Sequence, residues 1–258
     1  MTTHADSVAV VSAAAVAECR RAVAAAAATA RAVVHRAAGP TTGGATDPER
    51  GVLMREALAE ALVESRAAGA AEQLLTRLPD GPARTGASVA LAWQLPRHVA
   101  AMHGEIALTA PVAASPAGAG PEVNEAVADL MVRGAAQAAL GVVTSVAEQA
   151  CDVLPDLGEA LRDAAGRLSR ALAVEWAQEG EVRLAGMPHL LIPLGEVLCA
   201  AALVSDALAP GAAATSAVTA RRYLYRHLRS VAPEGLTDRH LARTAELVAE
   251  IRVSGVPQ

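Results

Sequence analysis

The chain has no phenylalanine and no lysine, and only two tyrosines and two tryptophans occur among its 258 residues. Isoleucine is rare as well, so the residues that favour β-strands are few. No segment alternates apolar and polar residues with the period of two that a half-buried strand requires. These absences exclude a fold built around a β-sheet.

A shortage of positive charge limits the partners of the protein. The formal net charge is −5, with 22 arginines against 27 acidic residues, and such a chain creates no basic field that would attract a phosphate backbone. With so few aromatic rings, the protein also lacks a platform on which bases could stack. We therefore expect no nucleic acid partner.

Cysteines are few and far apart. Cys19, Cys151 and Cys199 form no CxxC pair and lie among alanine and valine, so we predict that they are small buried hydrophobic residues. The N-terminus lacks the basic residue that precedes the apolar run of a secretory signal. The longest apolar stretch, 190–204, is shorter than a bilayer span. We expect a cytoplasmic protein with no membrane partner.

Several motifs of cofactor-binding proteins are missing from the sequence. Neither GxGxxG nor a Walker sequence occurs, which argues against a dinucleotide or P-loop site. No Glu is followed three residues later by His, as di-iron helical bundles require, and no Asp-rich Mg²⁺ motif appears. We therefore predict no metal-ligating residue, and the cofactor stays unassigned.

Alanine, by contrast, supplies roughly a quarter of the residues, and alanine and arginine both have high helix propensity. Glycine and proline divide the chain into helical segments. The predicted helices include Val8 to Ala38, Pro48 to Leu78, Thr85 to Leu108 with a bend at Pro96, Pro188 to Leu208, Ala213 to Val231 and Asp238 to Arg252. Between them, a leucine stripe at helical spacing predicts a buried face: Leu157, Leu161, Leu168 and Leu172.

The pattern predicts an all-α protein, an antiparallel helical bundle of about seven or eight helices. A loop of Ala, Pro, Gly and Ser over residues 109–120 is the best candidate for a domain boundary. It separates an N-terminal helical half, 1–108, from a C-terminal helical bundle, 121–258, unless the two form one continuous domain. The apolar faces exceed what one bundle buries, so we expect self-association into a homo-oligomer.

Two groups of polar residues interrupt apolar helical sequence and form the candidate site. His98, His103 and Glu105 lie close together near the end of the third predicted helix, and His189 and Glu196 lie seven residues apart in a later one. Titratable groups on apolar helices are the ones whose pKa values shift and which act as acids, bases or ligands. We predict that His103 and Glu105 line a pocket as catalytic residues and that His98, His189 and Glu196 bind a ligand. The alternative is capping or exposed histidines and a glutamate paired with arginine.

Arginines give one helix near the C-terminus a basic face, formed by Arg221, Arg222, Arg226 and Arg229. Guanidinium groups bind phosphates through paired hydrogen bonds, and we predict this role for Arg222 and Arg226. The alternative is a structural role, in which the basic face bonds to neighbouring acidic helices.

Residues of the second half resemble a known family. The segment RLAGMPHL at 183–190, the apolar helix that follows to residue 208, and the segment ARRYLYRHL at 220–228 are similar to the carboxy-terminal helical region of acyl-CoA dehydrogenases. The resemblance covers about residues 122–235. It implies an acyl-CoA dehydrogenase-like helical protein with an acyl thioester as ligand or a flavoprotein as partner.

Members of that family oxidise acyl thioesters with FAD, a Glu base and a middle β-domain. No segment here matches the β-domain, the signature around the base or the flavin-contacting glycines, so no catalytic residue carries over. The resemblance therefore implies a partner subunit or a degenerate relative without independent activity, with FAD present only if a partner shares it. The alternative function is a helical small-molecule-binding or assembly scaffold of a biosynthetic or regulatory pathway.

Overall fold

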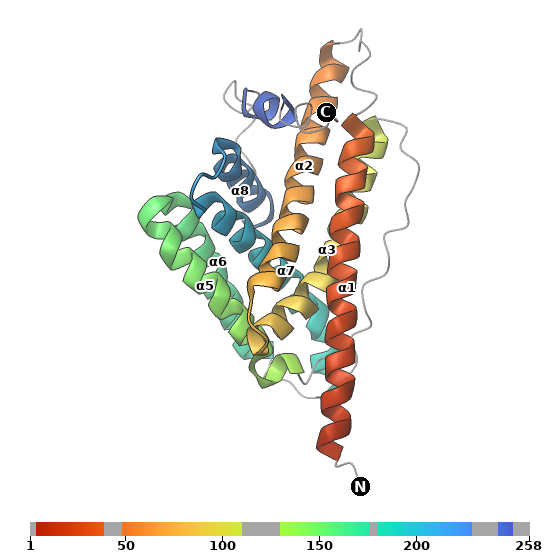
Figure 1. The fold of residues 1–258 in the computed structure, drawn as a ribbon, viewed down its shortest axis with the longest axis vertical. Coiled ribbons are helices and arrows are strands. Elements are labelled where there is room, and N and C mark those ends of the chain that lie inside the picture. The colour runs from red at the N-terminus through yellow and green to blue at the C-terminus, as the bar shows by residue number, and fades with distance from the viewer. Residues whose placement is uncertain (1–3, 39–47, 110–129, 176–179, 229–241, 250–258) are drawn as a thin grey trace.

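The computed structural model describes residues 4–38, 48–109, 130–175, 180–228 and 242–249 (Figure 1). These residues form helices joined by short turns, with no strand among them, which confirms the all-α prediction. The helices are α1 (His4–Ala38), α2 (Pro48–Arg77), α3 (Pro82–Thr109), α5 (Ala136–Val153), α6 (Pro155–Glu175), α7 (Gly180–Leu208) and α8 (Ala214–His227). A π-helical turn, η2 (Met131–Ala135), leads into α5, and residues 242–249 are also helical.

Proline and glycine mark most helix boundaries as predicted. Pro48 begins α2, the break between α2 and α3 lies at residues 78–81, and Pro96 lies inside α3 without ending it. α7 differs from the prediction, because it begins at Gly180 rather than near residue 188. Pro188 therefore lies in the interior of the helix rather than at its start, and Pro193 lies inside the helix as predicted. Packing of α7 on five other helices outweighs the helix-breaking tendency of these prolines.

α7 is the central helix of the described residues. It packs against α2, α3, α5, α6 and α8, while α1 packs against α2 and α3. Figure 1 shows α1 on one side of the molecule and the α5–α6 pair on the other. Because α3 also packs against α5, the hydrophobic core contains residues from both predicted halves of the chain.

Most of the predicted core positions are buried where the structure describes them. The leucine stripe of α6 is confirmed, with Leu157, Leu161, Leu168 and Leu172 all buried. Cys19 and Cys199 are buried as expected, whereas Cys151 is only half-buried.

α7 also holds a long apolar segment. Within the described ranges, His189–Leu208 is the one segment long and apolar enough to cross a membrane, with a mean hydropathy of 1.8. It exceeds the stretch seen in the sequence because the helix continues to Leu208. Inside the protein 67% of it is buried, as in the core helix of a bundle. The expected cytoplasmic location stays a prediction.

Close contact between α7 and α3 depends on Gly195. A Cβ atom at this position would lie 2.6 Å from the Cβ of Gln94 and 3.0 Å from the carbonyl oxygen of Ala90. The missing side chain thus lets the two helices approach closely, and it brings Gln94 against α7. Gly69 on α2 differs, since a Cβ there would meet only the guanidinium of Arg31 at 3.8 Å.

We predict opposite effects of alanine at these two glycines. Alanine gains up to about 1 kcal/mol over glycine in a helix interior, so Gly69→Ala should keep or raise stability. In Gly195→Ala the forced separation of α7 and α3 should outweigh that gain and lower the free energy of unfolding by about 1–3 kcal/mol. Urea denaturation followed by circular dichroism measures both. Equal stability of the two variants would contradict the close contact.

Candidate functional site

Four polar side chains from four helices meet in the interior of the bundle. They are Glu64 of α2, His98 of α3, Glu196 of α7 and His227 of α8, and we call them the histidine–carboxylate cluster. Glu64 is 8% exposed, and the other three side chains are between 14% and 21% exposed. The cluster therefore lies where unpaired charges are costly.

Each imidazole lies between the two carboxylates. Glu64 Oε1 is 2.6 Å from Nε2 of His227, and Glu64 Oε2 is 3.1 Å from Nδ1 of His98. The opposite ring nitrogens face Glu196, whose Oε1 is 3.7 Å from Nε2 of His98 and 3.8 Å from Nδ1 of His227. The two rings are stacked, with centroids 4.6 Å apart. All four ring nitrogens thus face a carboxylate.

Helical spacing adds a second layer of polar side chains one turn away. Gln94 precedes His98 by four residues on α3, Cys199 follows Glu196 by three on α7, and Tyr223 precedes His227 by four on α8. The Cys199 thiol donates to the amide oxygen of Gln94 at 3.5 Å, and the amide nitrogen of Gln94 donates to the Tyr223 hydroxyl at 3.5 Å. That amide nitrogen also lies 2.7 Å from each ring nitrogen of His98.

These surroundings shift the pKa values of the cluster. Burial alone would raise the pKa of Glu64, but hydrogen bonds from His227 and His98 lower it to about 2. Burial would lower the pKa of His227, but hydrogen bonds to Glu196 and Glu64 raise it to about 9. The same two carboxylates raise the pKa of His98, and the two histidines lower the pKa of Glu196. Ionised Glu64 and Glu196 beside a protonated His227 are therefore the stable state near neutral pH.

Beyond the cluster, burial keeps two neighbouring groups neutral. It raises the pKa of the Cys199 thiol and of the Tyr223 hydroxyl. Both groups therefore act as weak hydrogen-bonding neighbours of the charged residues rather than as further charges.

A network of ion pairs adjoins the cluster along α2 and α8. Nε of Arg222 donates to Glu60 at 2.5 Å, and its terminal nitrogens donate to Glu56 and, at 2.8 Å, to Thr244. Arg226 donates to Glu60 at 2.8 Å and lies 3.9 Å from Glu64. The Arg222 side chain is only 10% exposed, and its nitrogens donate to Glu56, Glu60 and Thr244. These contacts agree with the alternative in which the basic face bonds to acidic residues of a neighbouring helix.

The structure separates the candidate residues taken from the sequence. His98 and Glu196 come together in the cluster, whereas His189 is exposed on α7. His103 is buried, and its Nε2 has no hydrogen-bond partner among the described residues. The side chain of Glu105 lies outside the described residues, so the predicted role of His103 and Glu105 stays a prediction.

Sequence reasoning missed Glu64 and His227. The signal that could have found Glu64 is the series Glu56, Glu60 and Glu64, a stripe of carboxylates at intervals of four residues on a helix. For His227 the signal is its place on the same helix face as Tyr223, four residues earlier. Neither pattern says which helix lies opposite.

The cluster also has the donor atoms of a metal site. One ligand atom each from Glu64, His98 and His227 lie within 4.8 Å of one another. Two imidazole nitrogens and a carboxylate oxygen are ligands of Zn²⁺ and Fe²⁺ in proteins. The sequence, in contrast, predicted no metal ligand.

Comparison with protein-family models, with curated proteins and with solved structures gives no match for this chain.

We predict that the stability of the metal-free protein falls as the solution becomes alkaline. The pKa of His227 is raised from 6.5 to about 9 by folding, so its ion pairs stabilise the protein fully below pH 6.5 and are lost as the pH rises through 9. The free energy of unfolding should fall across this window by on the order of 3 kcal/mol. Urea denaturation with EDTA present measures it.

A substitution at His227 provides the control for this pH dependence. His227→Gln should remove most of the decline, whereas His189→Gln, which changes an exposed histidine of α7, should leave it intact. A stability profile of the unmodified protein that is flat from pH 6.5 to above 9 would contradict the ion pairs.

Proposed function

We propose that this protein binds one divalent transition-metal ion, Zn²⁺ or Fe²⁺, through Glu64, His98 and His227. The observation that carries the proposal is the convergence of their ligand atoms, one from each of α2, α3 and α8, within 4.8 Å of one another. Ligands from three helices fix a site only in the folded chain, so metal binding would also stabilise the bundle.

The donor set favours transition metals over Mg²⁺ and Ca²⁺. Those two ions prefer sites built from oxygen atoms, whereas imidazole nitrogens suit Zn²⁺ and Fe²⁺. The nitrogens available are Nδ1 of His98 and Nε2 of His227, the two that face Glu64. The Cys199 thiol, whose pKa burial raises, would not serve as a thiolate ligand.

Glu196 lies where a hydrogen-bond acceptor for the outer N–H groups of both metal-bound histidines would lie. The nitrogens that do not face Glu64 lie 3.7 Å and 3.8 Å from its carboxylate. In metal sites a ligating histidine donates its other N–H to such a carboxylate, which fixes the ring orientation and strengthens the metal bond. Glu64 and Glu196 together carry the two negative charges that a divalent ion would neutralise.

Three protein ligands leave room for a fourth. Structural zinc sites are closed by four protein ligands, whereas sites with three keep a position for water or a substrate and make bound water acidic. The proposed site is therefore of the kind that activates water, and Glu196 and the two histidines are partly exposed to solvent.

We predict one Zn²⁺ per chain in isothermal titration of EDTA-treated, dialysed full-length protein, with Mg²⁺ giving no heat. Glu64→Gln and His227→Gln should weaken binding by at least ~100-fold, and Glu196→Gln by about 10–100-fold, since it removes the outer partner alone. Cobalt substitution provides a second readout, because visible absorption bands report nitrogen and oxygen ligation directly.

His189→Gln is the matched control and should bind Zn²⁺ like the unmodified protein, since His189 is exposed outside the cluster. Circular dichroism confirms that each variant is folded. An unmodified protein that binds neither Zn²⁺, Fe²⁺ nor Co²⁺, or a loss in His189→Gln as large as in His227→Gln, would refute the proposal.

A second proposal rests on the sequence resemblance of residues 122–235 to acyl-CoA dehydrogenases. It describes an inactive partner subunit that binds an acyl thioester or a flavoprotein, and the resemblance alone supports it. Purified protein should then be colourless and associate with an acyl-CoA or a flavoprotein dehydrogenase. Stoichiometric bound FAD would contradict the inactive role. A protein that binds neither acyl-CoA nor a flavoprotein dehydrogenase would refute the proposal. Self-association likewise stays a prediction.

A further inference from the structure

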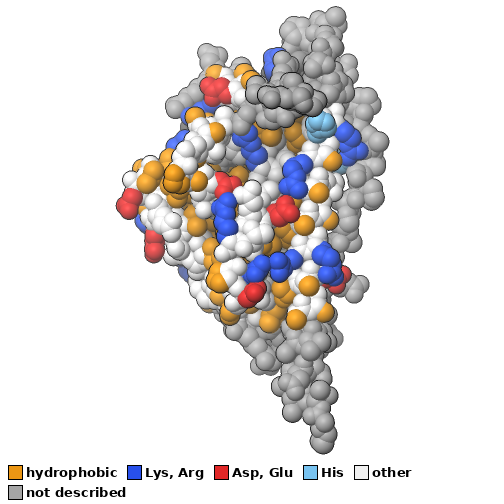
Figure 2. All heavy atoms as spheres, in the orientation of Figure 1, with side chains coloured by type: hydrophobic (Ala, Val, Ile, Leu, Met, Phe, Trp, Pro, Cys, Tyr) orange, Lys and Arg blue, Asp and Glu red, His pale blue; other side chains and the backbone are white. Residues whose placement is uncertain are grey.

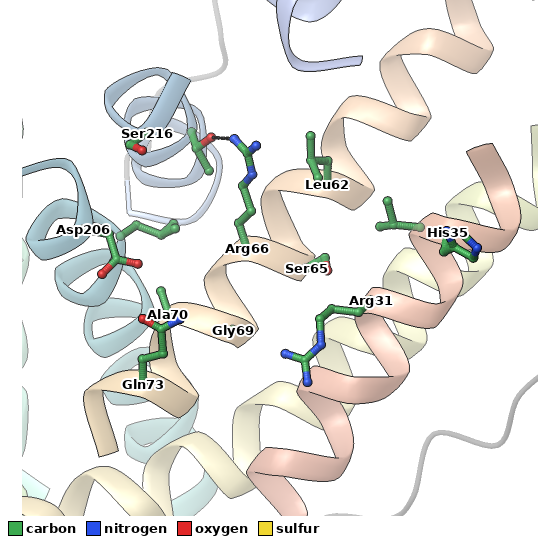
Figure 3. A pocket seen from close by; sticks show the side chains of 13 residues that line it. Arg31, His35, Leu62, Ser65, Arg66, Gly69, Ala70, Gln73, Asp206 and Ser216 are labelled. Atoms are coloured by element: carbon green, nitrogen blue, oxygen red, sulfur yellow. Dashed lines mark hydrogen bonds between the residues drawn. The ribbon is translucent and has the colours of Figure 1, made fainter. Parts of the chain in front are cut away.

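A cavity of about 540 Å³ lies between α1, α2, α7 and α8, apart from the histidine–carboxylate cluster (Figure 3). Its volume is in the range of cavities that hold small organic molecules. None of the four cluster residues lines it. The cavity is therefore a separate feature of the fold.

One part of the cavity wall is apolar. Val34 of α1, Leu62 and Ala70 of α2, and Leu203 of α7 contribute aliphatic side chains. Gly69 leaves free space in the cavity wall, because a Cβ atom at this position would meet only the guanidinium of Arg31. An aliphatic or aromatic body of a ligand would lose contact with water against these groups.

The other part of the wall carries guanidinium and hydroxyl groups. Arg31 of α1 and Arg66 of α2 lie on the wall, and Figure 3 shows Arg66 extending toward α8, where it donates to the Thr219 hydroxyl at 3.0 Å. Ser65 and Ser216 add hydroxyl groups. Guanidinium groups with nearby hydroxyls are the usual partners of carboxylate and phosphate.

Two acidic side chains near the cavity form ion pairs with arginines of α2 and α1. Asp206 lines the wall but pairs with Arg77 at 3.2 Å, and Glu72 pairs with Arg31 at 3.3 Å. The Arg31 side chain is 54% exposed, and an ion pair this exposed is weak enough to exchange for a ligand at little cost. Basic side chains also lie along the middle of the face in Figure 2, among apolar surface.

We propose that this cavity binds an amphipathic organic anion, a molecule with one carboxylate or phosphate group and an apolar body. The anionic group lies against Arg66 and the neighbouring hydroxyls, and the body lies along Val34, Leu62 and Leu203. This binding is independent of the proposed metal site.

The test uses decanoate as the probe and decanol as its uncharged counterpart, with the full chain in EDTA so that no metal takes part. Isothermal titration should show saturable binding of decanoate, with decanol at least ~10-fold weaker, because decanol lacks the charge that strengthens hydrogen bonds to a guanidinium group. Arg66→Gln should weaken decanoate by ~10-fold or more, and Arg20→Gln, an exposed arginine of α1 outside the cavity, should not. Octyl phosphate, titrated in parallel, tells whether the anionic group is a carboxylate or a phosphate.

Filling the cavity gives a second test that keeps every charge. Gly69→Leu should abolish binding of decanoate, while Gly141→Leu, at a helical glycine of α5 with open space around it, should bind normally. Thermal unfolding confirms that both variants are folded. Equal affinity for decanoate and decanol, absence of saturable binding, or full binding by Gly69→Leu would overturn the proposal, and none of these results bears on Zn²⁺ binding.

Discussion

Burial of the Glu64 carboxylate constrains the whole bundle. A carboxylate that is only 8% exposed and lacks a partner would cost several kcal/mol, a substantial share of the stability of a domain. His98 and His227 remove that cost only if α3 and α8 are correctly aligned against α2, and Glu196 sets the same condition for α7. The ion pairs of this one cluster thus constrain the register of four helices.

Small residues make this arrangement compatible with a close-packed core. Alanine occupies much of the buried surface, and Gly195 lets α7 approach α3 until Gln94 touches both the neighbouring helix and the cluster. Alanine has few atoms to interlock, so apolar packing by itself discriminates weakly between helix registers. The polar interior supplies the specificity that large side chains give to other bundles.

The two faces of α2 serve different chemistry. Glu64 contacts His98 of α3 and His227 of α8, and one ligand atom from each of the three residues lies within 4.8 Å of the others. Ser65, Arg66 and Gly69, on the adjacent part of the same helix, line a larger cavity with mixed apolar and basic walls. The proposed metal site and the cavity thus both involve α2, and α8 contributes to both through His227 and Thr219.

The sequence by itself determined the helical class, because alanine-rich segments and glycine and proline breaks act locally, and the leucine stripe of α6 follows from helical periodicity. It also pointed to His98 and Glu196 as titratable groups on apolar helices. Only the tertiary structure decided that these two belong with Glu64 and His227, that His189 faces outward, and that α7 begins before Pro188. The reason is physical: periodicity reports which face of a helix is buried, whereas the partner across the interface depends on contacts between residues on different helices, such as Glu64 and His227, which lie 163 positions apart.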